Sequence, residues 1–266
     1  MTRTALITGM SSGVGEATAA KLLQDGWNVV ATARREADAA RTLDGDKLLR
    51  ARLDVTDAAS IESAFALAAE RFGGVDVVVN NAGIGLAGPI EAIELDRLRD
   101  HFEVNVIGVA AVCRAAIAQM RARGSGLLIN VTSLTGRIGI PFLSPYCAGK
   151  FAVEGLTESM YYELRPLGIR VKLVEPGGVR TKFEHPWTVH PAYEPALDAV
   201  RLLMARGGER SAPPERVAGV IAAAATDRSD RLRYTATDAG ALLRLRRMLP
   251  DVALRTVIRR SFGLTL

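Results

Sequence analysis

A tyrosine and a lysine lie four residues apart, at Tyr146 and Lys150, where a segment with helical spacing of apolar residues begins. In a helix this spacing places both side chains on one face. A phenol with its ordinary pKa of about 10 is a poor acid or base at neutral pH, but a nearby cation stabilises the phenolate and lowers that pKa. The pair therefore predicts a proton-transfer device, although the same spacing also occurs on helices that only pack or face solvent.

A serine that could act on the same reacting atom follows a continuously apolar run. Ser133 comes directly after the expected strand Leu127–Thr132. Ligands in open α/β sheets bind at the carboxyl ends of the strands. A hydroxyl at this point can therefore hydrogen-bond an oxygen whose charge changes during a reaction.

A glycine-rich turn, Thr8–Gly15, joins the first apolar run to the first helical segment. Gly9 can take the tight turn, Gly13 lets the backbone approach a pyrophosphate, and Gly15 allows close packing of helix and strand. The free N–H groups at the start of the helix favour phosphate. The spacing differs from the commoner Gly-x-Gly-x-x-Gly fingerprint, and a strand-to-helix turn without a ligand is the alternative interpretation.

The end of the second apolar run indicates which dinucleotide would bind. Ala33 occupies the place where an NAD site favours an acidic residue for the ribose 2′-hydroxyl, and Arg34 and Arg35 follow. A guanidinium can pair with a 2′-phosphate. The sequence therefore predicts NADP(H), and a solvated arginine pair is the alternative.

These residues need a scaffold, and the chain alternates short apolar runs with longer helical segments. Runs that are continuously apolar are typical of strands buried on both faces. The alternation predicts an α/β fold, with a single Rossmann domain over residues 1–266 and a doubly wound parallel sheet covered by helices on both faces. The expected strands are Thr4–Thr8, Asn28–Ala33, Leu48–Leu53, Val75–Asn80, Leu127–Thr132 and Arg170–Glu175, and the expected helices are Gly15–Gln24, Ala58–Arg71, Leu95–Arg121 and Tyr146–Leu164.

Two segments depart from this rhythm. Residues 182–214, rich in proline and aromatic side chains, predict an irregular substrate-binding lid after the sixth strand, and residues 239–266 predict a basic helical tail. An apolar wall around one polar centre favours a hydrophobic substrate. The apolar side chains of the lid are Phe183, Pro186, Trp187, Val189, Tyr193, Leu197, Leu202 and Met204.

Composition excludes several classes of function. The net charge is +5, yet Met1 to Glu209 balance to −1 and the remaining residues, with 11 arginines and 5 acidic residues, to +6. No helix-turn-helix or aromatic basic groove accompanies this charge, so we expect no nucleic-acid partner.

Two cysteines and three histidines make a metal site unexpected. The first residues do not resemble a signal peptide, and we expect a cytoplasmic protein. The basic tail could lie on an anionic membrane, but packing on its own domain is favoured, and we do not expect membrane association.

Several motifs, taken in their order along the chain, resemble the short-chain dehydrogenase/reductase family, over about Thr2 to Thr181. The segment Glu175–Thr181 and the Ala-Arg-Arg end of the second strand resemble the branch near steroid and retinoid dehydrogenases, which prefers NADP. The motifs are Thr8–Gly15, Asp54-Val55, Asn80-Asn81-Ala82-Gly83, Asn105-Val106-Ile107-Gly108, Ser133, Tyr146-Cys147-Ala148-Gly149-Lys150, and Pro176-Gly177 followed by Thr181.

The resemblance implies a role for each catalytic residue. Tyr146 would be the general acid/base, and Lys150 would lower its pKa and bind the nicotinamide ribose. Ser133 would orient the substrate carbonyl or hydroxyl. Asn105, inside a helix, would hold a water that links Lys150 to solvent. The chemistry would be hydride transfer on the cofactor, with the protein supplying orientation and the proton.

The resemblance also implies the residues that bind the cofactor. Asp54 would accept from the adenine amino group with Val55 beside the ring, and Thr181 would contact the carboxamide. Arg34, with Arg35 in reserve, would carry the 2′-phosphate. The full predicted set is Gly9, Ser11, Ser12, Gly13, Val14, Gly15, Arg34, Arg35, Asp54, Val55, Asn81, Ala82, Gly83, Tyr146, Lys150, Pro176, Gly177, Val179 and Thr181.

One position departs from the pattern of the family. The family usually has serine where this chain has Gly149. Four further side chains, one cysteine and three histidines, could be read as functional or as structural. Cys147 is expected to pack as a small apolar residue rather than react. We expect His101 to be structural, and His185 and His190 to lie on the surface or at the rim of the substrate pocket, not to act as ligands.

The sequence thus predicts an NADP(H)-dependent oxidoreductase that interconverts a hydrophobic ketone or aldehyde and its alcohol. An epimerase or lyase on the same fold, and an NADP-binding regulator without catalysis, are the alternatives. The resemblance implies a homodimer or homotetramer that assembles through the helices Leu95–Arg121 and Tyr146–Leu164. We expect the apolar residues on the non-core faces of these helices to be Val109, Val112, Phe151, Val153 and Met160.

Overall fold

Seven strands form one parallel sheet, in the order β3-β2-β1-β4-β5-β6-β7. This computed structural model describes residues 2–39 and 42–264. The strand order changes direction between β1 and β4, which gives a doubly wound sheet with its switch point there. The predicted fold class is therefore confirmed. The strands are β1 (Thr4–Ile7), β2 (Asn28–Ala33), β3 (Leu48–Arg52), β4 (Val77–Asn80), β5 (Gly126–Val131), β6 (Ile169–Pro176) and β7 (Arg233–Ala236).

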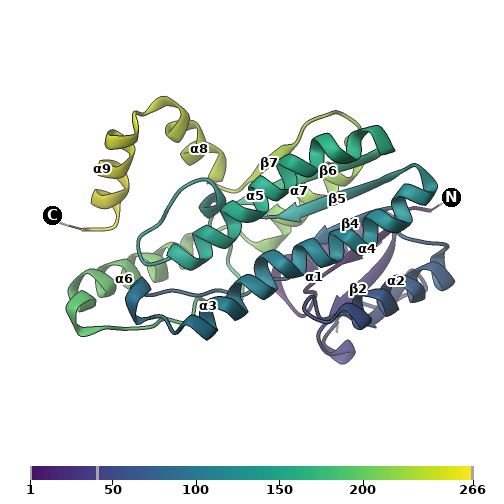
Figure 1. Ribbon diagram of the computed structural model, residues 1–266, viewed down its shortest axis with the longest axis horizontal. Helices are drawn as coiled ribbons and strands as arrows, with labels where there is room; N and C mark the ends of the chain where they lie inside the picture. Colours follow the sequence, from purple (N-terminus) through teal and green to yellow (C-terminus); the bar gives the residue numbers. More distant parts are fainter. Residues whose placement is uncertain (1, 40–41, 265–266) are drawn as a thin grey trace.

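Helices cover both faces of the sheet, and each face has its own apolar core. On one face α1 (Gly13–Gln24) and α7 (Pro214–Thr226) pack together over the strands. On the other lie α2 (Ala58–Phe72), α4 (Gly108–Arg123) and α5 (Ser144–Leu164), and Figure 1 shows this second layer in front of the sheet. Coverage on both sides is the reason that the strands read as continuously apolar.

The helix expected over Leu95–Arg121 is interrupted. It begins as α3 (Leu95–Phe102), passes through the π-helical turn η3 (Glu103–Ile107), and continues as α4. The continuous stretch Leu95–Arg123 is long and apolar enough to cross a membrane by length and composition. Its α4 part packs its apolar side on the sheet instead, through Val112, Cys113 and Met120. A π-turn is common at functional sites, because it rotates one side chain out of the helical repeat.

The lid is more regular than the sequence predicts. The 3-10 turn η6 (Pro191–Tyr193) leads into a helix, α6 (Glu194–Arg210), so the expectation of an irregular segment throughout 182–214 is wrong. Pro195 lies in the first turn of α6, where its missing N–H costs nothing. Leu197 and Val200, spaced for one helical face, are fully buried. The prolines that suggested a loop therefore mark the start of a helix.

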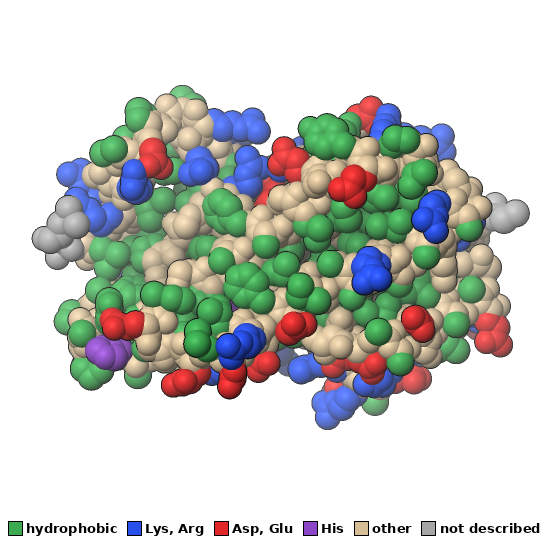
Figure 2. Space-filling model, in the orientation of Figure 1, with side chains coloured by type: hydrophobic (Ala, Val, Ile, Leu, Met, Phe, Trp, Pro, Cys, Tyr) green, Lys and Arg blue, Asp and Glu red, His purple; other side chains and the backbone are tan. Residues whose placement is uncertain are grey.

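The C-terminal part adds one strand and two helices. β7 pairs with β6 and buries Tyr234 and Ala236, but its four residues are too short for a clear sequence signal. The expected helical tail forms α8 (Ala239–Met248) and α9 (Asp251–Ser261), which make an arch beyond the sheet. Figure 2 shows basic side chains gathered on this arch. The arginines of α8 and α9 are Arg244, Arg246, Arg247, Arg255, Arg259 and Arg260.

Four of the five apolar residues assigned to the outer faces of α4 and α5 are buried in the protomer. Val112, Val153 and Met160 are 0%, 2% and 6% exposed and belong to the core on the α4–α5 side of the sheet, as does Val109. Phe151, 44% exposed, is the one that faces outward. The periodicity of a two-sided apolar helix does not tell which side meets the sheet, and the expectation was wrong for the other four.

Candidate active site

The predicted site residues converge on the carboxyl edge of the sheet around β1, β4, β5 and β6. The glycine turn follows β1, Asn81 follows β4, Ser133 follows β5, and Gly177 follows β6. Parallel strands end at the same edge, and the switch point between β1 and β4 leaves a crevice there. The fold therefore brings together motifs that lie up to about 170 residues apart in the chain.

The glycine turn is pressed against the segment that follows β4. Gly9 has φ +72°, and a Cβ there would lie 2.7 Å from the Cα of Ala82. At Gly15 a Cβ would lie 2.6 Å from the carbonyl oxygen of Gly9. Side chains are excluded at both positions, so the backbone of the turn stays open toward the crevice. This is the cradle that a pyrophosphate needs.

Asn81 fastens this turn from the side. Its Nδ2 donates to the carbonyl oxygens of Thr8 and Gly9, each at 3.0 Å. The Thr8 hydroxyl in turn accepts from the backbone N–H groups of Asn81 and Ala82, each at 3.0 Å. Asn81 and Thr8 thus hold the turn together, and the Thr8 hydroxyl is a contributor that the sequence did not single out.

The N-terminus of α1 is free to receive an anion. Ser12 is the N-cap residue, with an extended backbone and no side-chain capping hydrogen bond, and Ser11 beside it is exposed. Gly13 lies against Thr181, whose Cγ2 would be 3.1 Å from an added Cβ. The structure thus joins the start of α1 to the segment after β6, as a dinucleotide that spans both would require.

The two arginines after β2 differ in their surroundings. The Nε of Arg35 lies 2.5 Å from Asp38 Oδ2, so its guanidinium is engaged within its own turn. Arg34 is exposed at the end of β2, directly after the buried Ala33. Arg34 is therefore the better placed of the pair for a 2′-phosphate, in agreement with the order of preference from the sequence.

The predicted adenine contacts lie in the loop after β3. Asp54 Oδ1 accepts from the Thr56 backbone N–H at 3.0 Å and from its hydroxyl at 2.8 Å, which fixes the carboxylate. Val55 is 8% exposed and packs against Gly108 at the start of α4. The loop is thus held from both sides before any ligand arrives.

The three side chains predicted to be catalytic lie at the start of η4 and on α5. Ser133 caps the 3-10 turn η4 (Leu134–Gly136), where its Oγ accepts from Thr135 N at 3.1 Å, and it also hydrogen-bonds Tyr146. Lys150, one helical turn after Tyr146, lies with its Nζ 5.7 Å from the centre of the phenol ring and donates to Val131 O at 3.0 Å. A phenol, a hydroxyl and an ammonium thus lie close together at this edge of the sheet.

The acidity of the trio differs from the expectation. Burial raises the pKa of Tyr146 well above its ordinary value, and the hydrogen bond from Ser133 offsets only part of this rise. Burial also lowers the pKa of Lys150 to about 8, against the pull of the Glu154 carboxylate. The predicted lowering of the Tyr146 pKa is therefore not present in this geometry, because burial of the phenol is the largest influence on it.

Asn105 lies in the π-turn η3 and points to the loop after β4. Its Oδ1 accepts from Ile84 N at 3.0 Å and its Nδ2 donates to Ile84 O at 2.8 Å. Gly83 lies beside it, since a Cβ there would be 2.8 Å from Asn105 Oδ1 and 3.9 Å from Lys150 Nζ. Asn105 and Lys150 are thus brought to one place, as the sequence predicts.

The segment after β6 is anchored to β7. Gly177 N donates to Ala236 O at 3.2 Å and to Thr237 Oγ1 at 3.0 Å. Val179 forms a bridge with Ala212 between the lid and its base. Pro176 is buried, and Thr181 Oγ1 accepts from the backbone N–H of Phe183. The predicted border of the nicotinamide site is therefore held in place by β7, a strand that was not expected.

Part of the lid lies directly on the catalytic tyrosine. The His185 and Phe183 rings meet Tyr146 with ring centres 4.7 and 5.8 Å apart. His185 is half-buried against the Tyr146 ring. A small apolar cluster continues from this point, formed by Ala87, Ile140, Leu143, Tyr146, Cys147, Trp187 and Met204.

Only some of the apolar side chains of the lid join the apolar cluster that contains Tyr146 and Cys147. Trp187 and Met204 belong to the cluster around Tyr146, whereas Val189 and Leu202 are 55% and 52% exposed and do not line it. Cys147 is buried in the cluster and accepts from Ile140 N at 3.4 Å, so its packing role is confirmed.

A buried ionic network beneath the site was missed by the sequence analysis. Glu154, one turn after Lys150, accepts from the Thr132 hydroxyl at 2.6 Å and from Arg233 Nε at 3.1 Å. Glu175, 1% exposed, pairs with Arg137 at 3.0 Å and with Arg233 at 3.4 Å. These partners come from η4, α5, β6 and β7, so spacing in the sequence carries no signal of them.

Comparisons with known proteins agree with this geometry. The family model described as short chain dehydrogenase matches residues 3–191. The uncharacterized oxidoreductase YusZ of Bacillus subtilis is 36% identical over 250 residues, covering 86% of this chain and 87% of YusZ. Human 17-beta-hydroxysteroid dehydrogenase type 1 is 41% identical over 189 residues, covering 67% of this chain and 57% of the human protein.

Solved structures show the same fold. A short-chain dehydrogenase from Streptomyces avermitilis superposes with a TM-score of 0.82 and 34% identity, covering 98% of this chain and 99% of that one. A short chain dehydrogenase/reductase from Burkholderia phymatum in complex with NAD gives 0.82 at 28% identity, with 96% and 95% covered. An alcohol dehydrogenase from Thermococcus sibiricus complexed with 5-hydroxy-NADP gives 0.74 at 26% identity, with 89% and 97% covered.

Proposed function

The chain belongs to the short-chain dehydrogenase family of oxidoreductases, and within it we propose an NADP(H)-dependent enzyme that interconverts a hydrophobic ketone or aldehyde and its alcohol. The observation that carries this proposal is the Tyr146 phenol, hydrogen-bonded to Ser133 at the carboxyl edge of the sheet, with Lys150 one helical turn away. A bound nicotinamide cofactor supplies or takes up the hydride in such a reaction.

The protein's own residues would handle the proton. In the reducing direction Ser133 would hold the substrate carbonyl oxygen, and the Tyr146 phenol would give its proton to that oxygen as the hydride arrives at carbon. In the oxidising direction the phenolate would take the proton back. The raised pKa of Tyr146 favours the protonated phenol, which is the form needed for reduction.

The choice of NADP(H) rests on Arg34. The end of β2 offers an exposed guanidinium and, at Ala33, no carboxylate that would accept from a ribose 2′-hydroxyl. A charge-assisted hydrogen bond is worth about 1.5–3 kcal/mol. Since about 1.4 kcal/mol corresponds to tenfold in affinity, one such contact suffices for a preference of that size.

The hydrophobic substrate class rests on the surroundings of Tyr146. The Phe183 ring contacts Tyr146, Trp187 and Met204 pack against the same apolar cluster, and the polar His185 ring also contacts the phenol. A pocket of this kind favours a bulky apolar molecule with one reactive oxygen. We further propose a homodimer or homotetramer that uses the outer sides of α4 and α5, where Phe151 of α5 and Ile107, directly before α4, are exposed.

The test is consumption of reduced nicotinamide, followed by its absorbance, with a panel of hydrophobic ketones and aldehydes. We expect turnover with NADPH for at least one of them, and loss of turnover in Tyr146→Phe. Binding of NADPH without consumption by any substrate would favour the non-catalytic regulator. Substrate conversion without net change in NADPH would favour an epimerase or lyase.

A further inference from the structure

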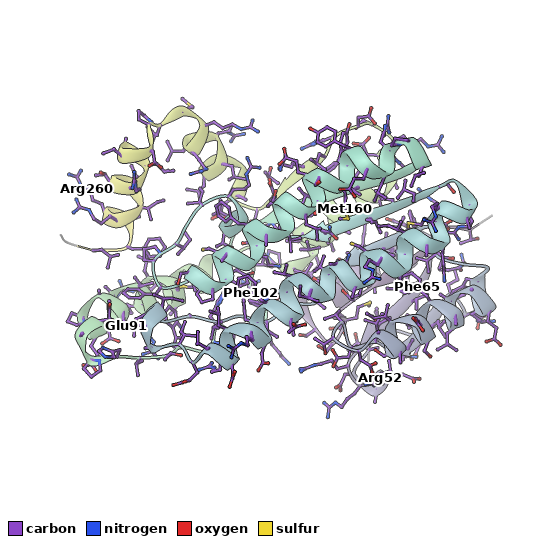
Figure 3. The ribbon with its side chains drawn as sticks, viewed as in Figure 1. Arg52, Phe65, Glu91, Phe102, Met160 and Arg260 are labelled. Atoms are coloured by element: carbon purple, nitrogen blue, oxygen red, sulfur yellow. The ribbon has the colours of Figure 1, made fainter. Side chains whose placement is uncertain are left out.

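His101 is a buried histidine that the proposed chemistry does not use. It lies in the last turn of α3, one helical turn before Asn105, and is 0% exposed. Figure 3 labels its neighbour Phe102, where α3 passes into the π-turn close to the start of α5. A polar ring that is fully removed from water needs hydrogen-bond partners inside the protein.

One partner of His101 is the amide of Asn105. Asn105 Nδ2 lies 3.0 Å from Nδ1 and 3.1 Å from Nε2 of His101, so either ring nitrogen can accept from it. The other hydrogen of this amide goes to Ile84 O, and its oxygen accepts from Ile84 N. With His101 in place both hydrogens of the Asn105 amide are used, and its orientation is fixed.

The second partner is at the start of the catalytic helix. His101 hydrogen-bonds the backbone of Pro145, and because proline has no N–H, the ring must donate to its carbonyl. Pro145 directly precedes Tyr146, whose ring meets His101 edge-on with centres 6.2 Å apart. Burial lowers the pKa of His101 to about 4, so at neutral pH the ring has one donor and one acceptor, one for each partner.

The space for this imidazole is left by Gly149. A Cβ at Gly149 would lie 3.3 Å from His101 Nε2, which is tighter than most Cβ contacts, and 3.7 Å from Asn105 Cβ, which is ordinary van der Waals contact. Gly149 directly precedes Lys150, and it is the position at which this chain lacks the serine usual in the family. A side chain at position 149 would therefore press on the His101 ring, whereas the glycine leaves it room.

We propose that His101 is a positioning residue of this active site. It joins the π-turn to the start of α5, and so holds Asn105, Tyr146 and Lys150 in fixed relation without touching substrate or cofactor. The proposal rests on the proposed oxidoreductase function, since His101 would act by keeping these three residues in place for proton transfer in that reaction.

The first experiment compares His101→Leu with His101→Gln in the full chain. Leucine removes both hydrogen bonds, whereas glutamine can still donate and accept. Because a misplacement of 1 Å costs about 10²-fold, we expect kcat of His101→Leu to fall by about tenfold or more. The Kd of NADPH should stay within about threefold, since cofactor contacts are not removed, and His101→Gln should recover kcat to within about threefold of the wild type.

The pH profile separates positioning from simple stabilisation. We expect the apparent pKa of the group that limits kcat/KM to be displaced in His101→Leu and restored in His101→Gln. A His101→Leu enzyme with a lower Tm but with unchanged kcat and an unchanged pH profile would overturn the proposal, since a merely structural residue gives that result.

A second experiment tests the contact without relying on turnover. Gly149→Ser introduces a side chain against the imidazole, and Gly155→Ser on the same helix is the matched control, because a Cβ at Gly155 meets nothing within 4 Å. We expect Gly149→Ser to lower the midpoint of urea unfolding more than Gly155→Ser. In a His101→Ala background Gly149→Ser should lower it less than in the wild type, or raise it. Additive effects of His101→Ala and Gly149→Ser would contradict this contact.

Together the two experiments separate a failure of the proposed function from a failure of the positioning role of His101. If the wild type turns over no substrate, the proposed function fails, yet the unfolding cycle still tests whether His101 occupies the space left by Gly149. If the wild type is active and His101→Leu keeps its kcat, only the positioning role fails.

Discussion

The ammonium of Lys150 donates a hydrogen bond of 3.0 Å to the carbonyl oxygen of Val131, the last residue of β5. This bond ties α5 to the strand that leads into Ser133. The lysine therefore holds together the two elements that carry the phenol and the hydroxyl of the site, in addition to providing its charge.

Tyr146→Phe should lower kcat by about 10² to 10⁴-fold, which is the usual contribution of a general acid/base. The change removes the transferable proton and keeps the ring that packs against His185 and Phe183. Initial rates of NADPH consumption measure the loss, and NADPH fluorescence titration should show a Kd within a few-fold of the wild type. Tyr162→Phe is the matched control, since Tyr162 lies on the same helix but is 70% exposed. A Tyr146→Phe enzyme with more than about a tenth of the wild-type rate would contradict the acid/base role.

Cofactor preference should follow Arg34. We expect the wild type to favour NADPH over NADH by about tenfold or more in kcat/KM, as one charge-assisted contact allows. The double change Ala33→Asp with Arg34→Ala should shift the preference toward NADH, because it removes an attraction and adds a repulsion. Arg35→Ala is the control and should change the ratio less, since that guanidinium is already paired with Asp38. A wild type that prefers NADH would show that the Arg34 argument is wrong.

Acid should destabilise the protein through its buried histidine. Burial lowers the pKa of His101 from its ordinary 6.5 to about 4, so the folded state binds this proton less tightly than the unfolded state. The contribution to stability is therefore complete above pH 6.5 and is lost as the pH falls toward 4. The loss is on the order of 3 kcal/mol in the free energy of unfolding. Urea unfolding at a series of pH values measures it, and His101→Gln should have a flatter dependence over this range; an equal slope in both proteins would exclude His101 as the cause.

The buried ionic network should be far more sensitive to truncation than a surface pair. Arg233→Met removes the guanidinium shared by Glu154 and Glu175 and leaves two carboxylates with less compensation in the interior. Breaking such a pair costs about 3–5 kcal/mol. Arg165→Met is the control, because Arg165 and Asp230 are both about half exposed and a surface pair is worth about 1 kcal/mol or less. Urea unfolding of both variants gives the comparison, and equal losses would show that burial does not matter here.

The sequence by itself determined the sheet, its two helical layers and the motifs at its carboxyl edge. Continuously apolar runs separated by amphipathic segments require a sheet covered on both faces, and this places the ends of its parallel strands together. The glycine turn, Ser133, Tyr146 and Lys150 are local patterns with fixed spacing, so their positions followed once the strands were recognised.

Only the tertiary structure decided the contacts that support those motifs. His101 reaches Asn105, Pro145 and Gly149 where α3 passes through the π-turn beside α5, and no periodicity in the sequence indicates such a turn. Glu154 and Arg233 lie 79 residues apart, and β7 is too short to be distinguished from a loop before it pairs with β6. Local propensity reports which segments can form elements, whereas side-chain partners across elements depend on packing geometry, which no single segment contains.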